Sequence, residues 1–157
     1  MKDTVTIRDT VSIKEELLRS GYIVYTNKGV SMMPLLRQDK DLMIIEKKKE
    51  GSLKKYDAVL FLRDNGQYVL HRILKVREKD YWIVGDHCVS GEYVREEQII
   101  GVLTGVIRDG KRISVTDRKY RFYVWLWCDF YPVRFFLLRM KSLAYRAVRK
   151  LKRRKRW

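Results

Sequence analysis

The stretch from residue 57 to residue 77 reads DAVLFLRDNGQYVLHRILKVR, two apolar runs separated by Asp64-Asn65-Gly66. Asn-Gly supplies the positive φ values that a tight hairpin requires, and the flanking runs are rich in residues that favour strands. Residues 57–62 and 67–77 are therefore predicted to form an antiparallel β-hairpin. Its second strand carries a histidine, His71, inside an apolar run.

Further short strands are predicted on both sides of this hairpin. The connections between them are too short for helical crossovers, which argues against a parallel sheet. A capping box at Ser12 and Glu15, with Gly21 as the stop signal, predicts a short helix before the first strand. We therefore expect a mainly β fold, a coiled antiparallel sheet preceded by a short helix. The other predicted strands are residues 22–25, 42–45, 81–84, 99–107 and 112–115.

The positive charge of the chain is concentrated at its C-terminal end. The chain has 157 residues and a net charge of +16. Residues 118–157 contain 14 Lys/Arg and one acidic residue, a net charge of +13, whereas residues 1–117 contain 21 Lys/Arg and 18 acidic residues, a net charge of +3. We therefore predict two parts, a globular domain over residues 1–117 and a basic aromatic tail over residues 118–157.

The tail combines aromatic side chains with a helical pattern of apolar residues. Residues 120–131 include seven aromatic residues, and Pro132 can begin a basic amphipathic helix. Such a tail has three interpretations: contact with an anionic membrane surface, contact with nucleic acid, or packing on the domain. We favour the membrane, because aromatic rings lie at headgroup depth and basic side chains attract anionic lipid. The predicted membrane contacts are Trp125, Trp127, Phe135 and Phe136.

A serine lies on a predicted bend between the first two strands. Gly29 precedes Ser31 by two residues, and Pro34 follows it by three. Gly29 allows the backbone to approach a ligand closely, and Pro34 fixes the direction of the chain after the bend. A serine held in this way presents its hydroxyl beside free backbone N–H groups, as a nucleophile requires.

Three segments, in this order, resemble one family of peptidases. They are Ser31-Met32-x-Pro34 followed by Asp41, the strand with His71-Arg72, and a strand that ends in Gly85-Asp86. This order resembles the type I signal peptidases, in the branch that pairs serine with histidine (the endoplasmic-reticulum, archaeal and sporulation-type enzymes). The wider clan, which includes self-cleaving repressor proteases, also has members that use lysine in place of the histidine. The resemblance covers about residues 20 to 110.

The resemblance implies a serine endopeptidase that cleaves leader or signal peptides after small side chains. Ser31 would be the nucleophile, with its own backbone N–H stabilising the oxyanion, and His71 the general base. Asp86 is expected to orient His71. The residues that follow Asp86 depart from the family pattern, and Glu92 is the alternative acidic partner. Asp41 is interpreted as a structural turn residue ahead of a strand.

Cofactors and disulfides are not expected. His71, His87 and Cys88 lack the spacing and the fourth ligand of a structural zinc site. Cys88 and Cys128 are too few for a disulfide framework. The sequence has neither a signal-peptide pattern nor an uncharged apolar run long enough to span a membrane. We therefore expect a location in the cytoplasm, or peripheral on the cytoplasmic face of a membrane.

A second hypothesis is a degenerate peptidase fold that acts as a binding module. The altered sequence after Asp86 and the lack of an apolar anchor ahead of Ser31 favour it. Its partner would be a membrane surface or nucleic acid, rather than a protein or peptide substrate with a leader segment.

Overall fold

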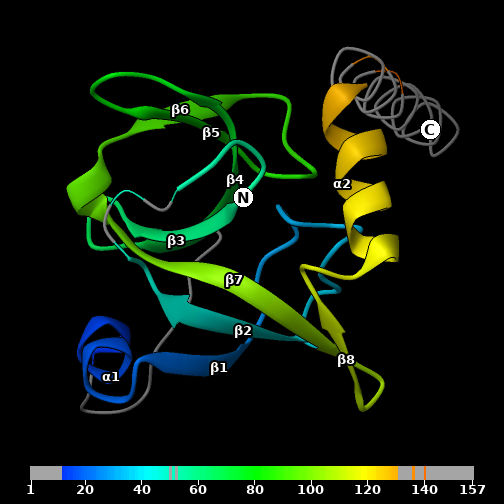
Figure 1. Ribbon diagram of the computed structural model, residues 1–157, viewed down its shortest axis with the longest axis horizontal. Helices are drawn as coiled ribbons and strands as arrows, with labels where there is room; N and C mark the ends of the chain where they lie inside the picture. The colour runs from blue at the N-terminus through cyan, green and yellow to red at the C-terminus, as the bar shows by residue number, and fades with distance from the viewer. Residues whose placement is uncertain (1–11, 50, 52, 131–135, 137–139, 141–157) are drawn as a thin grey trace, which may run out of the picture.

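One antiparallel sheet forms the body of the protein, with one helix before its first strand and one after its last strand in the chain (Figure 1). The computed structural model describes residues 12–49, 51, 53–130, 136 and 140. The strands lie in the order β1-β2-β7-β3-β4-β5-β6, with β8 paired to β7, and every pair is antiparallel. The predicted mainly β, antiparallel fold is confirmed. The elements are α1 (Ile13–Ser20), β1 (Tyr22–Thr26), β2 (Leu42–Lys47), β3 (Ala58–Leu62), β4 (Tyr68–Val76), β5 (Tyr81–Val84), β6 (Gly91–Val94), a 3₁₀ turn η1 (Glu96–Gln98), β7 (Ile99–Arg108), β8 (Lys111–Ser114) and α2 (Arg118–Asp129).

The short helix α1 begins and ends where the sequence predicts. The Ser12 side chain accepts a hydrogen bond from the backbone N–H of Lys14, and the Glu15 carboxylate accepts one from the backbone N–H of Ser12 at 3.2 Å. Gly21 ends the helix with φ at 79°, and its N–H donates to the carbonyl of Leu17. The left-handed conformation explains why glycine stands at this position.

The hairpin of β3 and β4 is also confirmed, and it divides the interior into two clusters. Gly66 closes the turn with φ at 80° and donates its N–H to the Arg63 carbonyl at 2.9 Å. Successive side chains on a strand point to opposite faces. On these two strands the odd-numbered residues Val59, Phe61, Val69 and Ile73 enter one buried cluster, and the even-numbered residues Ala58, Leu60 and Leu70 enter the other.

The sequence prediction missed strand β6. The segment Gly91–Val94 contains a glycine and a glutamate and is only four residues long, so it resembles a loop. Pairing with β5 makes it a strand, with Glu92 opposite Ile83. This strand matters for the site, because its register decides which way Glu92 points.

Helix α2 begins at the predicted boundary between domain and tail, and it packs on the domain. Tyr120, Val124 and Cys128 recur at a spacing of four and are buried against partly buried side chains from the domain, including Leu74 and Ile113. The helix therefore forms in a segment for which the sequence predicted an aromatic cluster but no helix. The predicted helix after Pro132 lies largely outside the described residues, and the division into two parts stays a prediction.

In the part of the chain that the structure describes, no helix has both the length and the apolar character needed to cross a membrane.

Candidate functional site

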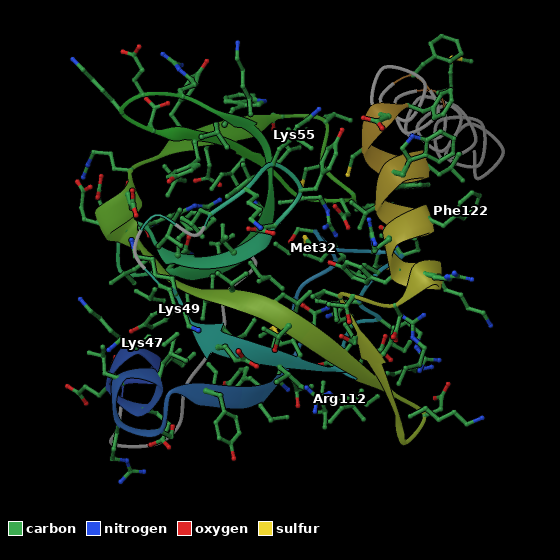
Figure 2. The ribbon with its side chains drawn as sticks, in the orientation of Figure 1. Met32, Lys47, Lys49, Lys55, Arg112 and Phe122 are labelled. Carbon is green, nitrogen blue, oxygen red and sulfur yellow. The ribbon has the colours of Figure 1, made fainter. Side chains whose placement is uncertain are left out.

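The loop that carries Ser31 is fixed at both ends. Asn27, which is buried, donates its backbone N–H to the Asp41 carbonyl at 3.2 Å, and its side-chain amide donates to the Gly29 carbonyl at 2.7 Å. Met32, next to the serine, is only 1% exposed and is anchored in the core; Figure 2 labels it. Ser31 is therefore held on a turn whose neighbours cannot shift freely, as the bend in the sequence predicts.

Asp41 lies just before β2 and ties this loop to β7. Its buried carboxylate accepts hydrogen bonds from the backbone N–H and guanidinium of Arg37 and from Arg108, at 2.7 to 3.0 Å. Burial alone would raise the pKa of Asp41, but the hydrogen bonds from Arg108 and Arg37 outweigh it and lower the pKa to about 2. Asp41 thus stays ionised and supports the loop, which fits its structural interpretation.

His71 lies on β4 with its ring buried. Only 6% of the residue is exposed, and the ring stands beside Phe61, with 6.1 Å between centroids. Among the described residues neither ring nitrogen makes a hydrogen bond. Because buried polar groups are nearly always hydrogen-bonded, a buried imidazole that makes no hydrogen bond with the described residues is a candidate functional group.

The turn after β5 contacts both the backbone of Ser31 and the ring of His71. His87 donates its backbone N–H to the Ser31 carbonyl at 2.7 Å. A methyl group placed on Gly85 would lie 2.7 Å from that same carbonyl oxygen and 3.0 Å from Cδ2 of His71. Gly85 therefore lies close to both the serine turn and the imidazole, and a side chain at this position would push the two apart.

Glu92 lies at the other edge of the imidazole. Its Oε1 is 3.5 Å from Nδ1 of His71, whereas Gly85 and the Ser31 turn face Cδ2, the carbon bonded to Nε2. The guanidinium of Arg63 holds Glu92 through two hydrogen bonds, of 2.8 and 2.5 Å. Burial opposes ionisation of Glu92, yet the interactions with His71 and Arg63 prevail and lower its pKa to about 2. An anionic carboxylate therefore faces Nδ1.

Asp86, the predicted partner of His71, has a different partner. Both of its carboxylate oxygens accept from the guanidinium of Arg72 at 2.8 Å, and one also accepts from the hydroxyl of Tyr123 at 2.9 Å. The Asp86 backbone carbonyl accepts from the indole of Trp127 at 2.8 Å. Asp86 and Arg72 are both fully buried. The structure thus brings Glu92, and not Asp86, to the imidazole.

Strand alternation is the physical reason for this exchange of partners. His71 and Arg72 are neighbours on β4, so they point to opposite faces. Ile73 shares a face with His71, and the register pairs Ile73 with Ile83 and Ile83 with Glu92, which puts Glu92 on that same face. Arg72 points to the other face, towards Asp86 and α2.

The donor for an oxyanion would be the backbone N–H of Ser31. Within the described part of the chain this N–H has no hydrogen-bond acceptor, so it is available to a ligand. The Ser31 hydroxyl and His71 do not form a hydrogen bond in this arrangement. Catalytic hydrogen bonds are often loose before substrate binds and tighten in the complex, so this geometry is compatible with a nucleophile and base pair.

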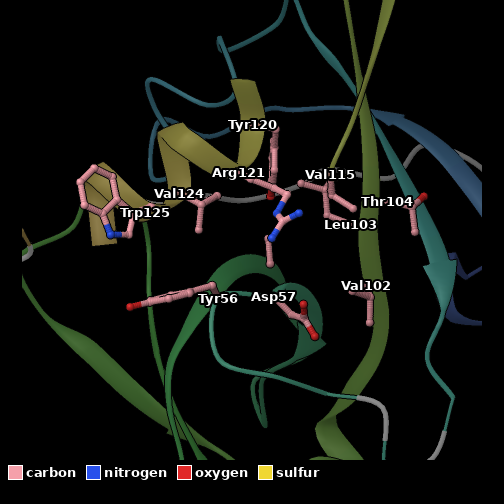
Figure 3. A pocket seen from close by; sticks show the side chains of 11 residues that line it. Tyr56, Asp57, Val102, Leu103, Thr104, Val115, Tyr120, Arg121, Val124 and Trp125 are labelled. Atoms are coloured by element: carbon pink, nitrogen blue, oxygen red, sulfur yellow. The ribbon is translucent and has the colours of Figure 1, made fainter. Parts of the chain in front are cut away.

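Two pockets in the described part of the chain each contain at most one of Ser31, His71 and Glu92. A groove of about 390 Å³ lies between α2 and strands β3 and β7, and it is lined by none of Ser31, His71 and Glu92 (Figure 3). Glu92 lines a second pocket, of about 330 Å³, together with Arg63 and Tyr93. This second pocket opens beside the carboxylate that faces His71.

The histidine and cysteine residues near the site were also considered as metal ligands and as disulfide partners. No group of three or more His, Cys, Asp or Glu side chains is placed to hold a metal ion there. Among the described residues, Cys88 and Cys128 are not joined in a disulfide.

The predicted membrane contacts in the tail fall into different environments. Trp125 and Phe136 are exposed, at 51% and 61%. Trp127 is half-buried and donates its indole N–H to the backbone carbonyl of Asp86. It therefore joins α2 to the turn after β5 and is not a fully exposed membrane contact. Phe135 lies outside the described residues.

No protein-family model matches the chain, and no curated protein matches its sequence.

Proposed function

We propose that this chain is a serine endopeptidase of the signal-peptidase type, in which Ser31 is the nucleophile, His71 the general base and Glu92 the group that orients His71. The observation that carries the proposal is the buried imidazole of His71, whose Nδ1 faces the anionic Glu92 at 3.5 Å and whose opposite edge faces the turn that contacts Ser31. Glu92 takes the role that was predicted first for Asp86, because the Asp86 carboxylate is engaged by Arg72 and Tyr123.

In the acylation step, the Ser31 oxygen attacks the carbonyl carbon of the scissile peptide bond. Nε2 of His71 accepts the hydroxyl proton as the C–O bond forms. The negative charge that develops on the carbonyl oxygen is stabilised by the Ser31 N–H. The resulting imidazolium is stabilised by Glu92 at Nδ1. It then gives its proton to the leaving amine as the C–N bond breaks, which leaves an acyl-enzyme.

In the second step, water attacks the acyl-enzyme. His71 takes a proton from this water and returns one to Ser31 when the ester bond breaks, so the net reaction is hydrolysis of one peptide bond. A substrate would bind as an extended strand along the sheet, with small side chains before the cleaved bond, as the resemblance implies. Leader or signal segments are the proposed substrates.

Glu92→Gln is expected to lower kcat/KM for peptide cleavage by roughly 10²- to 10⁴-fold, because an amide cannot stabilise the imidazolium. The measurement is cleavage of a mixed peptide library, quantified by mass spectrometry. The pKa of about 2 keeps Glu92 ionised at every pH above about 4. In the parent protein, protonation of Glu92 should therefore cause no loss of rate as the pH falls to about 4.

The control for this substitution is Glu97→Gln, which removes an exposed carboxylate in the turn after β6. It should cleave at the parent rate. Full activity in Glu92→Gln, together with an equal fold in circular dichroism, would refute the role assigned to Glu92.

The second candidate function is a binding module built on an inactive peptidase fold. Two observations favour it: Ser31 and His71 form no hydrogen bond in the described structure, and α2 presents a basic and apolar surface. Peptide cleavage that disappears with Ser31 and His71 would exclude this candidate as the whole function.

A further inference from the structure

We propose that helix α2 carries a docking surface for an anionic membrane, separate from the peptidase site. The surface, called here the outward face, consists of Phe122, Trp125, Leu126 and Phe130. Phe122, Trp125 and Leu126 are three and one positions apart, so they lie on one side of the helix, and Phe130, which caps its C-terminal end, contacts Trp125. This inference does not depend on catalysis.

The outward face is an apolar patch in contact with solvent. Its four side chains are between 45% and 61% exposed. The rings of Phe122 and Trp125 lie 5.8 Å apart, and those of Trp125 and Phe130 lie 6.0 Å apart, so the aromatic residues form one cluster. Figure 2 shows Phe122 directed away from the sheet. An aromatic cluster of this kind on a surface indicates an interaction site.

The domain itself does not need this face. The opposite side of α2 already packs on the domain through Tyr120, Val124 and Cys128. Tyr123 and Trp127 anchor the helix further by their hydrogen bonds to Asp86. A helix that covers one core is normally polar on its other side. Two apolar sides on one short helix therefore indicate a second contact partner.

The charge around the outward face matches an anionic membrane. Arg118, Lys119 and Arg121 are exposed at the start of α2, and none of them forms an ion pair with the described residues. The segment from 118 to 157 has 14 Lys/Arg against one acidic residue. Basic side chains attract anionic headgroups, and Trp and Phe are the residues that settle at the interface between headgroups and acyl chains.

The groove beside α2 extends this apolar surface. Trp125 belongs both to the outward face and to the lining of the groove, and Arg121 lines the groove as well (Figure 3). Val102, Leu103 and Val115 supply apolar walls from the domain. The outward face is therefore continuous with a recess that has apolar walls and contains one basic side chain, Arg121, and one acidic side chain, Asp57.

The test is flotation of the full chain with vesicles of phosphatidylcholine alone or mixed with phosphatidylglycerol, at low and high salt. The parent should float with the mixed vesicles and keep a salt-resistant part of its binding, because apolar burial is not screened by salt. Phe122→Gln/Trp125→Gln should weaken this binding by at least about tenfold, since each large apolar side chain removed from the membrane costs about that factor. Gln favours helices, so α2 should persist.

The matched control is Leu18→Gln/Tyr22→Gln, which removes two exposed apolar side chains, one on α1 and one on β1. Its binding should equal that of the parent. Equal flotation of the α2 variant and the parent would overturn the proposal. Failure of the parent to bind either vesicle would also overturn the proposal. This holds even if the α2 variant changes self-association or salt-sensitive binding to an oligonucleotide.

Discussion

Ser31→Ala is expected to abolish peptide cleavage, with kcat/KM reduced by at least about 10³-fold. The hydroxyl of Ser31 is the only group of the proposed site that forms the covalent intermediate. It makes no hydrogen bond within the described residues, so its removal should leave the fold and its stability unchanged. The measurement is turnover of a mixed peptide library by the purified variant, with urea unfolding as the check on stability.

The control is Ser90→Ala, which removes an exposed serine from the loop that leads to Glu92. Its activity should lie within about twofold of the parent, as for a surface substitution away from the reacting atoms. If Ser31→Ala cleaved the library as fast as the parent, the activity would belong to another residue or to a contaminant, and the proposed function would fail.

Asp86→Asn should cause the largest loss of stability, about 3 to 5 kcal/mol in the free energy of unfolding. The reason is that Arg72 would remain buried and charged without its partner. Arg72 is fully buried, and its Nη1 already donates to the Tyr56 carbonyl and the Tyr120 hydroxyl. Urea denaturation, monitored by circular dichroism, measures the change.

The double variant Arg72→Met/Asp86→Leu provides a second measurement on the same pair. It removes both charges and should recover most of the stability lost in Asp86→Asn, because replacing a whole buried ion pair by apolar side chains is often close to neutral. Asp64→Asn, at an exposed turn, serves as the control and should change stability by less than about 0.5 kcal/mol. A loss below about 1 kcal/mol in Asp86→Asn would contradict the buried pair.

Together, the variants at Asp86 and Glu92 separate two carboxylates that the sequence alone cannot tell apart. Asp86→Asn should lose activity only in proportion to its unfolded fraction, whereas Glu92→Gln should stay folded and lose catalysis. A folded, stable and inactive Asp86→Asn would favour the original assignment from the sequence.

Local signals in the sequence predicted most of the fold. The capping box at Ser12 and Glu15 and the turn at Asn65-Gly66 act over a few residues, so a helix and a hairpin can be placed from them. Strand β6 could not be placed, because four residues around Glu92 become a strand only through pairing with β5. That pairing joins two chain segments across a loop whose conformation no local rule specifies.

Prediction of the site from the sequence has the same limit. The Ser31 bend and the histidine strand were identified from residue types and from the ordered segments that resemble a peptidase family. The acidic partner depends on register, because alternation on β4 separates His71 from Arg72 and the β5–β6 pairing aligns Glu92 with His71. The anchoring of α2 on Asp86 by Tyr123 and Trp127 was missed, since it joins residues about 40 positions apart.

The most direct test of the central claim is covalent labelling of the intact chain with a serine-acylating β-lactam or penem, followed by peptide mass spectrometry. An activated Ser31 should carry the acyl adduct, and His71→Ala should remove it while the fold remains. An adduct that forms equally in His71→Ala, or no adduct on Ser31 in the parent even when anionic vesicles are present, would contradict a catalytic pair of Ser31 and His71.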